Sequence, residues 1–244
     1  KMNFNTRYGH YKFTVIPFGL TNAPATFNRL MSDVFKKYLD EFVLVFFDDI
    51  LVYSKNEEEY ESHVCKVLQI LRENQLFAKK SKCSFFTPKV EYLGFVVTKD
   101  GVSTDLAKVE AILSWPQPKS IREVRGFLGL SGWYRMFIKD YATIASPLTS
   151  ILKKNKTFQW TKEAQESFEK LKIMLTTTPV LSLPDFSKMF VLTTGASLIA
   201  VSGVLEQENR PVAFESRKLR DHEKNYATHD LELLAVVHAL KMWR

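Results

Sequence analysis

Apolar residues recur at helical spacing in two segments of the first hundred residues, 25–42 and 56–75. The expected buried positions are Phe27, Leu30, Met31, Val34, Phe35 and Leu39 in the first segment and Tyr60, Val64, Val67, Leu68 and Leu71 in the second. Asn22 and Asn56 stand where helix N-caps are expected. Residues 43–53, VLVFFDDILVY, predict two short strands joined by a tight turn and covered on both faces.

The pattern changes along the rest of the chain. Residues 83–101 predict strands and a hairpin, and from there to about residue 157 only helical spacing is found, with Ser120 and Glu123 placed as a capping box. From residue 158 onward we expect a helix that begins after Thr161, three short strands and a last helix from about Asp221. The sequence therefore predicts an α+β fold in three parts, 1–100, 101–157 and 158–244.

Composition narrows the function classes. The 244 residues are 45% hydrophobic and 25% charged, which is typical of a globular chain, and the apolar runs are too short to cross a bilayer. No signal segment opens the sequence, so we expect an intracellular protein, cytoplasmic or nuclear, that is not bound to a membrane. Cys65 and Cys83 lack zinc-site spacing and are expected to be reduced thiols.

The formal net charge of +7 is clustered in residues 79–83, 121–125 and 151–156. Clusters of this kind are compatible with a nucleic acid as partner, and from charge alone a solvated basic surface is equally compatible.

Asp48 and Asp49 are adjacent carboxylates between two apolar runs. Their repulsion and the cost of holding them beside buried strands would be offset by a divalent cation, and Mg²⁺ prefers such hard oxygen ligands. The alternative is that aspartates simply favour tight turns, which for an isolated pair is the better explanation. The neighbouring sequence has to decide between the two.

Four motifs occur in the order and spacing of the reverse transcriptase of gypsy-class LTR retrotransposons: PFGLTNAPATF at 17–27, FFDDILVYS at 46–54, VEYLGFVV at 90–97 and RGFLGLSGWYRMFI at 125–138. The chain resembles that family over essentially its whole length. The resemblance implies a partial fingers and palm in 1–100, a helical thumb in 101–157, and the connection and first part of a truncated ribonuclease H-like α/β domain in 158–244.

The resemblance also implies roles for individual residues. Asp48 and Asp49 match the metal-binding, catalytic aspartates, with Mg²⁺ or Mn²⁺ as the cofactor. The nucleotide and template pocket is expected at Pro17, Phe18, Gly19, Phe46 and Phe47, and the primer grip at Tyr92, Leu93 and Gly94. The nucleic-acid-binding residues of the thumb are expected to be Arg122, Arg125, Gly126, Gly129 and Trp133.

Gly126, Gly129 and Gly132 recur every third residue, and each glycine inside a helix costs roughly 1 kcal/mol relative to alanine. Close approach of a nucleic-acid backbone is one reason for such a pattern, and tight helix packing is the other. The aromatics Trp133, Tyr134 and Phe137 would stack on a nucleic acid or, as is commoner at helical spacing, lie in the core. The five histidines form no metal or triad arrangement.

In the last part, TTGASLIAVSGVL resembles the first strands of the ribonuclease H domain, and Glu232 matches its catalytic glutamate. The family has an aspartate where Gly195 stands, so we expect this domain to be inactive. The first polymerase aspartate of the family is expected upstream of Lys1, which implies little or no polymerase activity from this polypeptide alone.

Three hypotheses follow. The chain is a fragment of an active RNA-directed DNA polymerase that uses deoxynucleoside triphosphates in its intact parent. It is a host-adopted or degenerate remnant that binds primer–template or RNA:DNA hybrid without chemistry. Or it is an interaction protein that uses the thumb and the last helix to dock a protein partner. The oligomeric state is not predicted.

Overall fold

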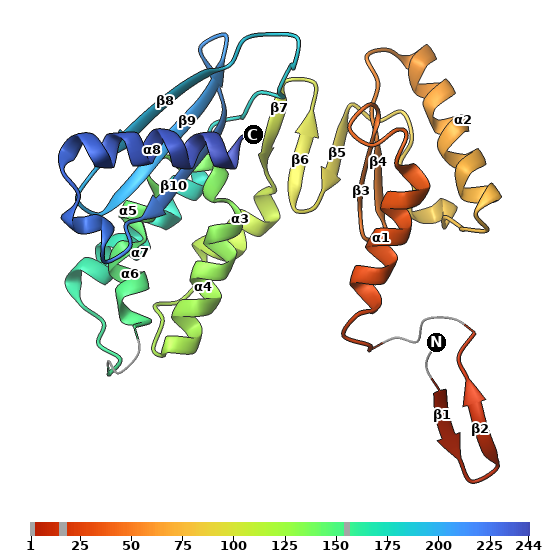
Figure 1. Ribbon diagram of the computed structural model, residues 1–244, viewed down its shortest axis with the longest axis horizontal. Coiled ribbons are helices and arrows are strands. Elements are labelled where there is room, and N and C mark those ends of the chain that lie inside the picture. Colours follow the sequence, from red (N-terminus) through yellow and green to blue (C-terminus); the bar gives the residue numbers. More distant parts are fainter. Residues whose placement is uncertain (1–2, 15–18, 154–156) are drawn as a thin grey trace. The chain divides into compact units, whose positions relative to one another are not determined.

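The computed structural model describes residues 3–14, 19–153 and 157–244 (Figure 1). The chain folds as two compact units, Lys1–Thr87 and Pro88–Arg244. No helix in the described residues is both long and apolar enough to cross a membrane. The boundaries at residues 100 and 157 stay a prediction.

The first unit begins with a two-stranded antiparallel ribbon, β1 (Asn3–Thr6) and β2 (Gly9–Lys12). All eight strand residues are exposed. Phe4 stacks on Tyr11 across the ribbon at 5.7 Å between ring centroids, a cross-strand aromatic pair that stabilises a short hairpin.

The main body of the first unit packs two helices against a hairpin. It consists of α1 (Ala23–Phe35), β3 (Val43–Phe46), β4 (Asp49–Val52) and α2 (Glu57–Glu73), followed by a 3₁₀ turn, η1 (Lys80–Lys82). Its buried core is Met31, Phe35, Phe42, Val43, Val67 and Leu71. Both helices and both strands were predicted in these segments, and the Asn56 side chain accepts the capping hydrogen bond from the Glu59 amide at 2.8 Å.

Four details of this unit were predicted wrongly. The Asn22 side chain makes no capping hydrogen bond to α1. Helix α1 ends at Phe35, because the Tyr38 carbonyl accepts from the amides of Phe42 and Val43 in a turn that leads into β3. Leu30 and Leu68, expected to be buried, are 45% and 47% exposed. The β3–β4 hairpin is covered on one face, where Val43 packs in the core. The opposite face carries the exposed apolar residues Leu44, Phe46 and Tyr53.

The second unit opens with a three-stranded antiparallel sheet, β5 (Lys89–Tyr92), β6 (Phe95–Thr98) and β7 (Gly101–Thr104). The strand β7 lies where only helices were expected. Gly101 has φ +138°, and an added Cβ would lie 2.0 Å from the Leu181 carbonyl oxygen. Val102 and Leu181 exchange backbone hydrogen bonds of 2.8 Å, so a distant segment completes this strand.

A helical layer follows, with α3 (Leu106–Leu113), α4 (Ile121–Trp133), η2 (Arg135–Phe137), α5 (Tyr141–Ile144), α6 (Ser146–Ile151) and α7 (Lys162–Thr176). Ser120 and Thr161 cap α4 and α7 as predicted. The inward residues predicted for α7 are all buried: Ala164, Phe168, Leu171 and Leu175. These residues join Val124, Phe127 and Phe137 in one large core.

The last element is a second antiparallel sheet in the order β10-β9-β8, from β8 (Val191–Ala196), β9 (Ala200–Gln207) and β10 (Arg210–Lys218). Helix α8 (Thr228–Met242) crosses β8 and β9 on one face, and α5 packs against β10 (Figure 1). The prediction that the last helix starts near Asp221 is wrong, because a short 3₁₀ turn, η3 (Glu223–Asn225), precedes it.

A buried carboxylate, that of Glu223, holds the loop between β10 and α8 in place. Glu223 is 4% exposed and receives two hydrogen bonds from the Arg217 guanidinium, at 2.8 and 3.1 Å. The Arg220 amide donates a third, at 2.7 Å. The Arg217 hydrogen bonds lower the pKa of Glu223 from 4.5 to about 2.

We expect Glu223→Gln to lower the free energy of unfolding of the second unit at neutral pH by about 2 kcal/mol, a typical value for hydrogen bonds to a charged group. Because folding depresses this pKa, the difference from wild type should be full above pH 4.5 and shrink as the pH falls toward 2. Urea unfolding followed by tryptophan fluorescence measures it, since all four tryptophans lie in this unit.

The matched control is Asp221→Asn, which removes an exposed carboxylate from the same loop. This variant should unfold almost as the wild type does. Equal loss of stability in the two variants, or a difference that does not depend on pH, would contradict the assignment of Glu223 as the buried anchor.

Candidate functional site

Asp48 and Asp49 lie at the tip of the β3–β4 hairpin. Phe46 pairs with Asp49, so Phe47 and Asp48 form a two-residue turn. Phe47 has φ +53°, a conformation that is unfavourable for a bulky side chain. Its amide donates a hydrogen bond of 3.2 Å to the Asn28 side-chain oxygen in α1, which fixes the turn from the neighbouring helix.

Both aspartates are exposed to solvent, so the prediction that they lie beside a fully buried sheet is wrong. Water hydrates both carboxylates, and no burial penalty has to be offset by a cation. The oxygens still suit a hard divalent ion, which is commonly bound by one or two carboxylates together with substrate phosphates. Across the described ranges no group of three or more His, Cys, Asp or Glu side chains is arranged to hold a metal.

The predicted nucleotide pocket is seen in part. Pro17 and Phe18 lie outside the described residues. Gly19 has φ +90° just ahead of α1, with nothing within 4 Å of an added Cβ. Phe46 is 39% exposed and packs edge-on against Phe47, at 4.6 Å between ring centroids. The aromatic residues beside the aspartates therefore present a half-open apolar surface.

In the second unit, Tyr92 is the last residue of β5, and Leu93 and Gly94 form the two-residue turn that leads to β6. Leu93 and Gly94 have φ of +54° and +80°, the paired left-handed conformation of a tight hairpin turn. The Leu93 carbonyl accepts from Trp133 Nε1 at 3.2 Å, and the Gly94 carbonyl accepts from the Tyr134 hydroxyl at 3.0 Å. The predicted primer grip is thus joined to the end of α4.

The thumb residues predicted from the resemblance share one exposed face of α4. They are Arg122, Arg125, Gly126, Gly129 and Trp133, in which the neighbours Arg125 and Gly126 each lie three to four residues from Arg122 and from Gly129. Buried residues of α4 on the other side include Val124 and Phe127. The exposed face is therefore a continuous stripe, here called the α4 stripe, that ends at the β5–β6 turn.

The three glycines of α4 have different surroundings. An added Cβ at Gly126 would lie 3.5 Å from the Trp115 ring, and one at Gly132 would lie 3.5 Å from the Tyr141 hydroxyl. Both distances are ordinary packing contacts. At Gly129 none of the described residues beyond the helix's own backbone lies within 4 Å of an added Cβ, so packing among them does not explain a glycine there.

The aromatic residues beside the glycines are also found in two environments, the core and the surface. Tyr134 and Phe137 are 1% and 2% exposed, so they belong to the core. Trp133 is 50% exposed and stacks on Phe95 at 5.9 Å between centroids. The hydrogen bond from the Tyr134 hydroxyl to the Gly94 carbonyl was missed by sequence reasoning, although the hydroxyl of a buried tyrosine usually has a hydrogen-bond partner.

Gly195 and Glu232 lie in the last sheet and in α8. An added Cβ at Gly203 would meet Ala239 of α8 and Trp243 directly after it, so Gly203 and its cross-strand neighbour Thr194 face that helix. Gly195 faces the other way and lines a cavity of about 540 Å³ together with Lys139, Asp140 and Lys170. Glu232 is exposed on α8.

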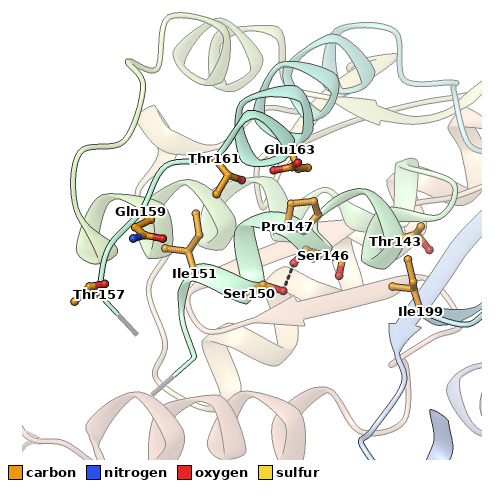
Figure 2. Close-up of a pocket in the computed structure, with 10 residues that line it drawn as sticks. All are labelled: Thr143, Ser146, Pro147, Ser150, Ile151, Thr157, Gln159, Thr161, Glu163 and Ile199. Atoms are coloured by element: carbon orange, nitrogen blue, oxygen red, sulfur yellow. Dashed lines mark hydrogen bonds between the residues drawn. The ribbon is translucent and has the colours of Figure 1, made fainter. Parts of the chain in front are cut away.

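No sequence motif pointed to the second cavity of this unit, of about 380 Å³. Figure 2 shows its lining, which is rich in hydroxyl groups: Thr143, Ser146, Ser150, Thr157 and Thr161. The Ser150 hydroxyl donates to the Ser146 carbonyl at 2.8 Å. The Lys218 ammonium donates to the same Ser150 hydroxyl at 3.3 Å, and burial together with nearby Lys153 lowers the pKa of Lys218.

Two family descriptions match separate parts of the chain. Residues 1–97 match "Reverse transcriptase (RNA-dependent DNA polymerase)", and residues 160–244 match "RNase H-like domain found in reverse transcriptase". The Asp48–Asp49 hairpin falls in the first match and Gly195 in the second.

Curated relatives match over almost the whole chain. The retrovirus-related Pol polyprotein from transposon 297 of Drosophila melanogaster is 45% identical over all of this chain, which covers 23% of that polyprotein. The Pol polyprotein from transposon gypsy of the same organism is 40% identical over 98% of the chain, which covers 24% of it. The chain thus spans about a quarter of the length of these relatives.

A solved structure of the foamy viral protease-reverse transcriptase in complex with RNA/DNA hybrid has a TM-score of 0.84 at 23% identity. The match covers 98% of this chain and 33% of that one, and it shows the fold. With the two family matches and the polyprotein relatives, it confirms both the predicted fold class and the resemblance. The chain belongs to the reverse transcriptase and RNase H-like region of gypsy-class retrotransposon Pol polyproteins.

Proposed function

We propose that this chain supplies the metal-binding hairpin, the primer-positioning turn and the nucleic-acid-binding helix of an RNA-directed DNA polymerase. The observation that carries the proposal is the α4 stripe, whose exposed arginines and glycine run along one helix face to the Leu93–Gly94 turn. A surface of that form suits a nucleic-acid backbone, because guanidinium groups pair with phosphates and a glycine lets the backbone approach.

The partner is a primer–template duplex or an RNA:DNA hybrid. The foamy viral relatives of known structure were solved with RNA/DNA hybrid and with dsDNA. The formal charge of +7 on this chain favours the same class of ligand. In this assignment residues 1–100 are the partial fingers and palm, 101–157 the thumb, and 158–244 the connection and ribonuclease H-like part.

Reverse transcriptases and RNase H-like enzymes generally use divalent metal ions. Asp48 and Asp49 would hold Mg²⁺ or Mn²⁺ with the phosphates of an incoming deoxynucleoside triphosphate. The ion supplies charge stabilisation for phosphoryl transfer. The turn that carries the aspartates keeps its conformation through Asn28, and Phe46 and Phe47 line the adjacent nucleotide pocket.

The alternative is a chain that binds nucleic acid without chemistry. Two observations favour it: Gly195 brings no carboxylate to the ribonuclease H-like part, and the described residues hold no cluster of three possible metal ligands. Among the catalytic residues predicted from the resemblance, Glu232 would then be the carboxylate that remains in the ribonuclease H-like part.

Replacing both arginines, in Arg122→Ala/Arg125→Ala, should weaken binding of a primer–template duplex. The binding constant K falls with salt, and each lost phosphate contact makes the slope of log K against log salt less steep by about 0.9. The slope of the double variant should therefore be less steep by about 2. Fluorescence anisotropy over a range of salt concentrations gives the slope. The control Lys162→Ala/Lys170→Ala removes the same charge from exposed positions of α7 and should keep the slope. Equal slopes in both variants would contradict the assignment of the α4 stripe.

Gly129→Ala separates binding from stability. Alanine is the better helix former by about 1 kcal/mol, and the space around Gly129 is open, so the free energy of unfolding should rise. Binding should weaken about five-fold if the bare backbone contacts the duplex. Urea unfolding and anisotropy on one protein sample measure both. A stabilised variant with unchanged affinity would show that Gly129 makes no contact with nucleic acid.

The double variant Asp48→Asn/Asp49→Asn tests the hairpin. Mn²⁺ should broaden NMR signals of residues 46–50 in the wild type and leave them sharp in the variant, because amides are much weaker ligands than carboxylates. Glu57→Gln/Glu58→Gln, in the exposed first turn of α2, is the matched control. Broadening centred on α2 would rule out the hairpin as the ion site.

Primer extension with Mg²⁺ or Mn²⁺ tests whether this chain alone carries a complete polymerase site. We expect little or no extension by the wild-type chain, because a two-metal transfer requires more carboxylate ligands than Asp48 and Asp49 provide. Extension by the wild type that disappears in the double variant would show that the chain carries a complete polymerase site.

A further inference from the structure

The turn between β5 and β6 is held from outside its own strands. Trp133 is the last residue of α4 and Tyr134 follows it, and these two consecutive side chains donate to the consecutive carbonyls of Leu93 and Gly94. The donor and acceptor pairs are 40 residues apart in sequence. The conformation of the turn therefore depends on the end of a helix.

The turn needs such support. Leu93 has φ +54°, which side chains other than glycine, asparagine and aspartate rarely adopt. Gly94 has φ +80°, and an added Cβ would lie 3.3 Å from the Tyr134 hydroxyl oxygen. Phe95 then packs against both donors, stacked on Trp133 and edge-on to Tyr134 at 5.7 Å between centroids.

Tyr134 is the fixed end of this arrangement. Its side chain is 1% exposed and belongs to the large core of the second unit, so the hydroxyl has no water to bond with and depends on a protein acceptor. The Gly94 carbonyl has one other donor, the Asp105 amide, at the longer distance of 3.4 Å. The shorter hydrogen bond connects the turn to the helical core.

We propose that Tyr134, together with Trp133, is a positioning residue that sets the primer-grip turn relative to α4. Nucleic acid lying along the α4 stripe then meets Leu93 and Gly94 in one fixed geometry, so that the primer end is held while the duplex is bound by the helix. The inference rests on the proposed function of the stripe and the turn. Tyr134 acts only through the Gly94 carbonyl and is not a catalytic residue.

The variant that tests the inference is Tyr134→Phe, which removes one buried hydroxyl and leaves the α4 stripe intact. Tyr141→Phe is the matched control, because the Tyr141 hydroxyl lies in the same helical core and bonds to Ser131 at 3.0 Å and to the Leu128 carbonyl at 3.5 Å rather than to the turn. Both variants keep the aromatic ring in place, so both should fold.

The first measurement is hydrogen–deuterium exchange of the full chain without nucleic acid. Amides of residues 92–95 should exchange about five-fold faster in Tyr134→Phe, the effect of one lost hydrogen bond, and at the wild-type rate in Tyr141→Phe. An unchanged rate in Tyr134→Phe, or an equal increase in both variants, would overturn the inference.

The second measurement uses a primer–template duplex with 2-aminopurine as the last primer nucleotide. Tyr134→Phe should bind the duplex within about two-fold of the wild-type affinity, since the α4 stripe is unchanged, yet alter the fluorescence of the primer end. Tyr141→Phe should change neither. Unaltered fluorescence in Tyr134→Phe would refute the positioning role and leave the proposed function standing. Absence of duplex binding by the wild type would refute the proposed function, and the positioning role with it.

Discussion

A bulky residue with left-handed backbone persists only where surrounding groups hold it, and both candidate sites of this chain are built on a hairpin turn that contains such a residue. In the first unit, Phe47 at φ +53° is held through its amide by Asn28 of α1. In the second, Leu93 and Gly94 are held through their carbonyls by Trp133 and Tyr134. Each turn presents its functional atoms at the end of paired strands, and each owes its shape to a helix of the same unit.

Local signals in the sequence were sufficient for most of the elements. Asn56, Ser120 and Thr161 each cap the helix they were expected to cap, because a cap depends on residues within one turn. Apolar spacing also identified the buried face of α7. Errors arose where contacts beyond one helical turn are involved. The strand β7 pairs with β6 along its whole length and is bridged by Leu181 on its other side, and the loop before α8 is held by the Arg217–Glu223 pair, which spans six residues.

The candidate site was predictable to a similar extent. The resemblance named the residues of the α4 stripe, and helical geometry then required them to share a face. The two hydrogen bonds that join Trp133 and Tyr134 to the turn span 40 residues, and the bond from Phe47 to Asn28 spans 19. No local pattern encodes such pairs. The exposure of Asp48 and Asp49 was also missed, since apolar flanking residues indicate strands but not which face is covered.

The ribonuclease H-like part keeps a structural role that does not depend on Gly195. The helical layer is joined to β10, where the partly buried Glu215 carboxylate lies 3.8 Å from Arg135 and 3.4 Å from His238 of α8. The Ser216 hydroxyl accepts from the Ala142 amide at 2.9 Å. Gly195 lies on β8, two strands away, and lines an open cavity. The contacts of Glu215 and Ser216 that join the sheet to the helical layer therefore lie on β10, on a different strand from Gly195.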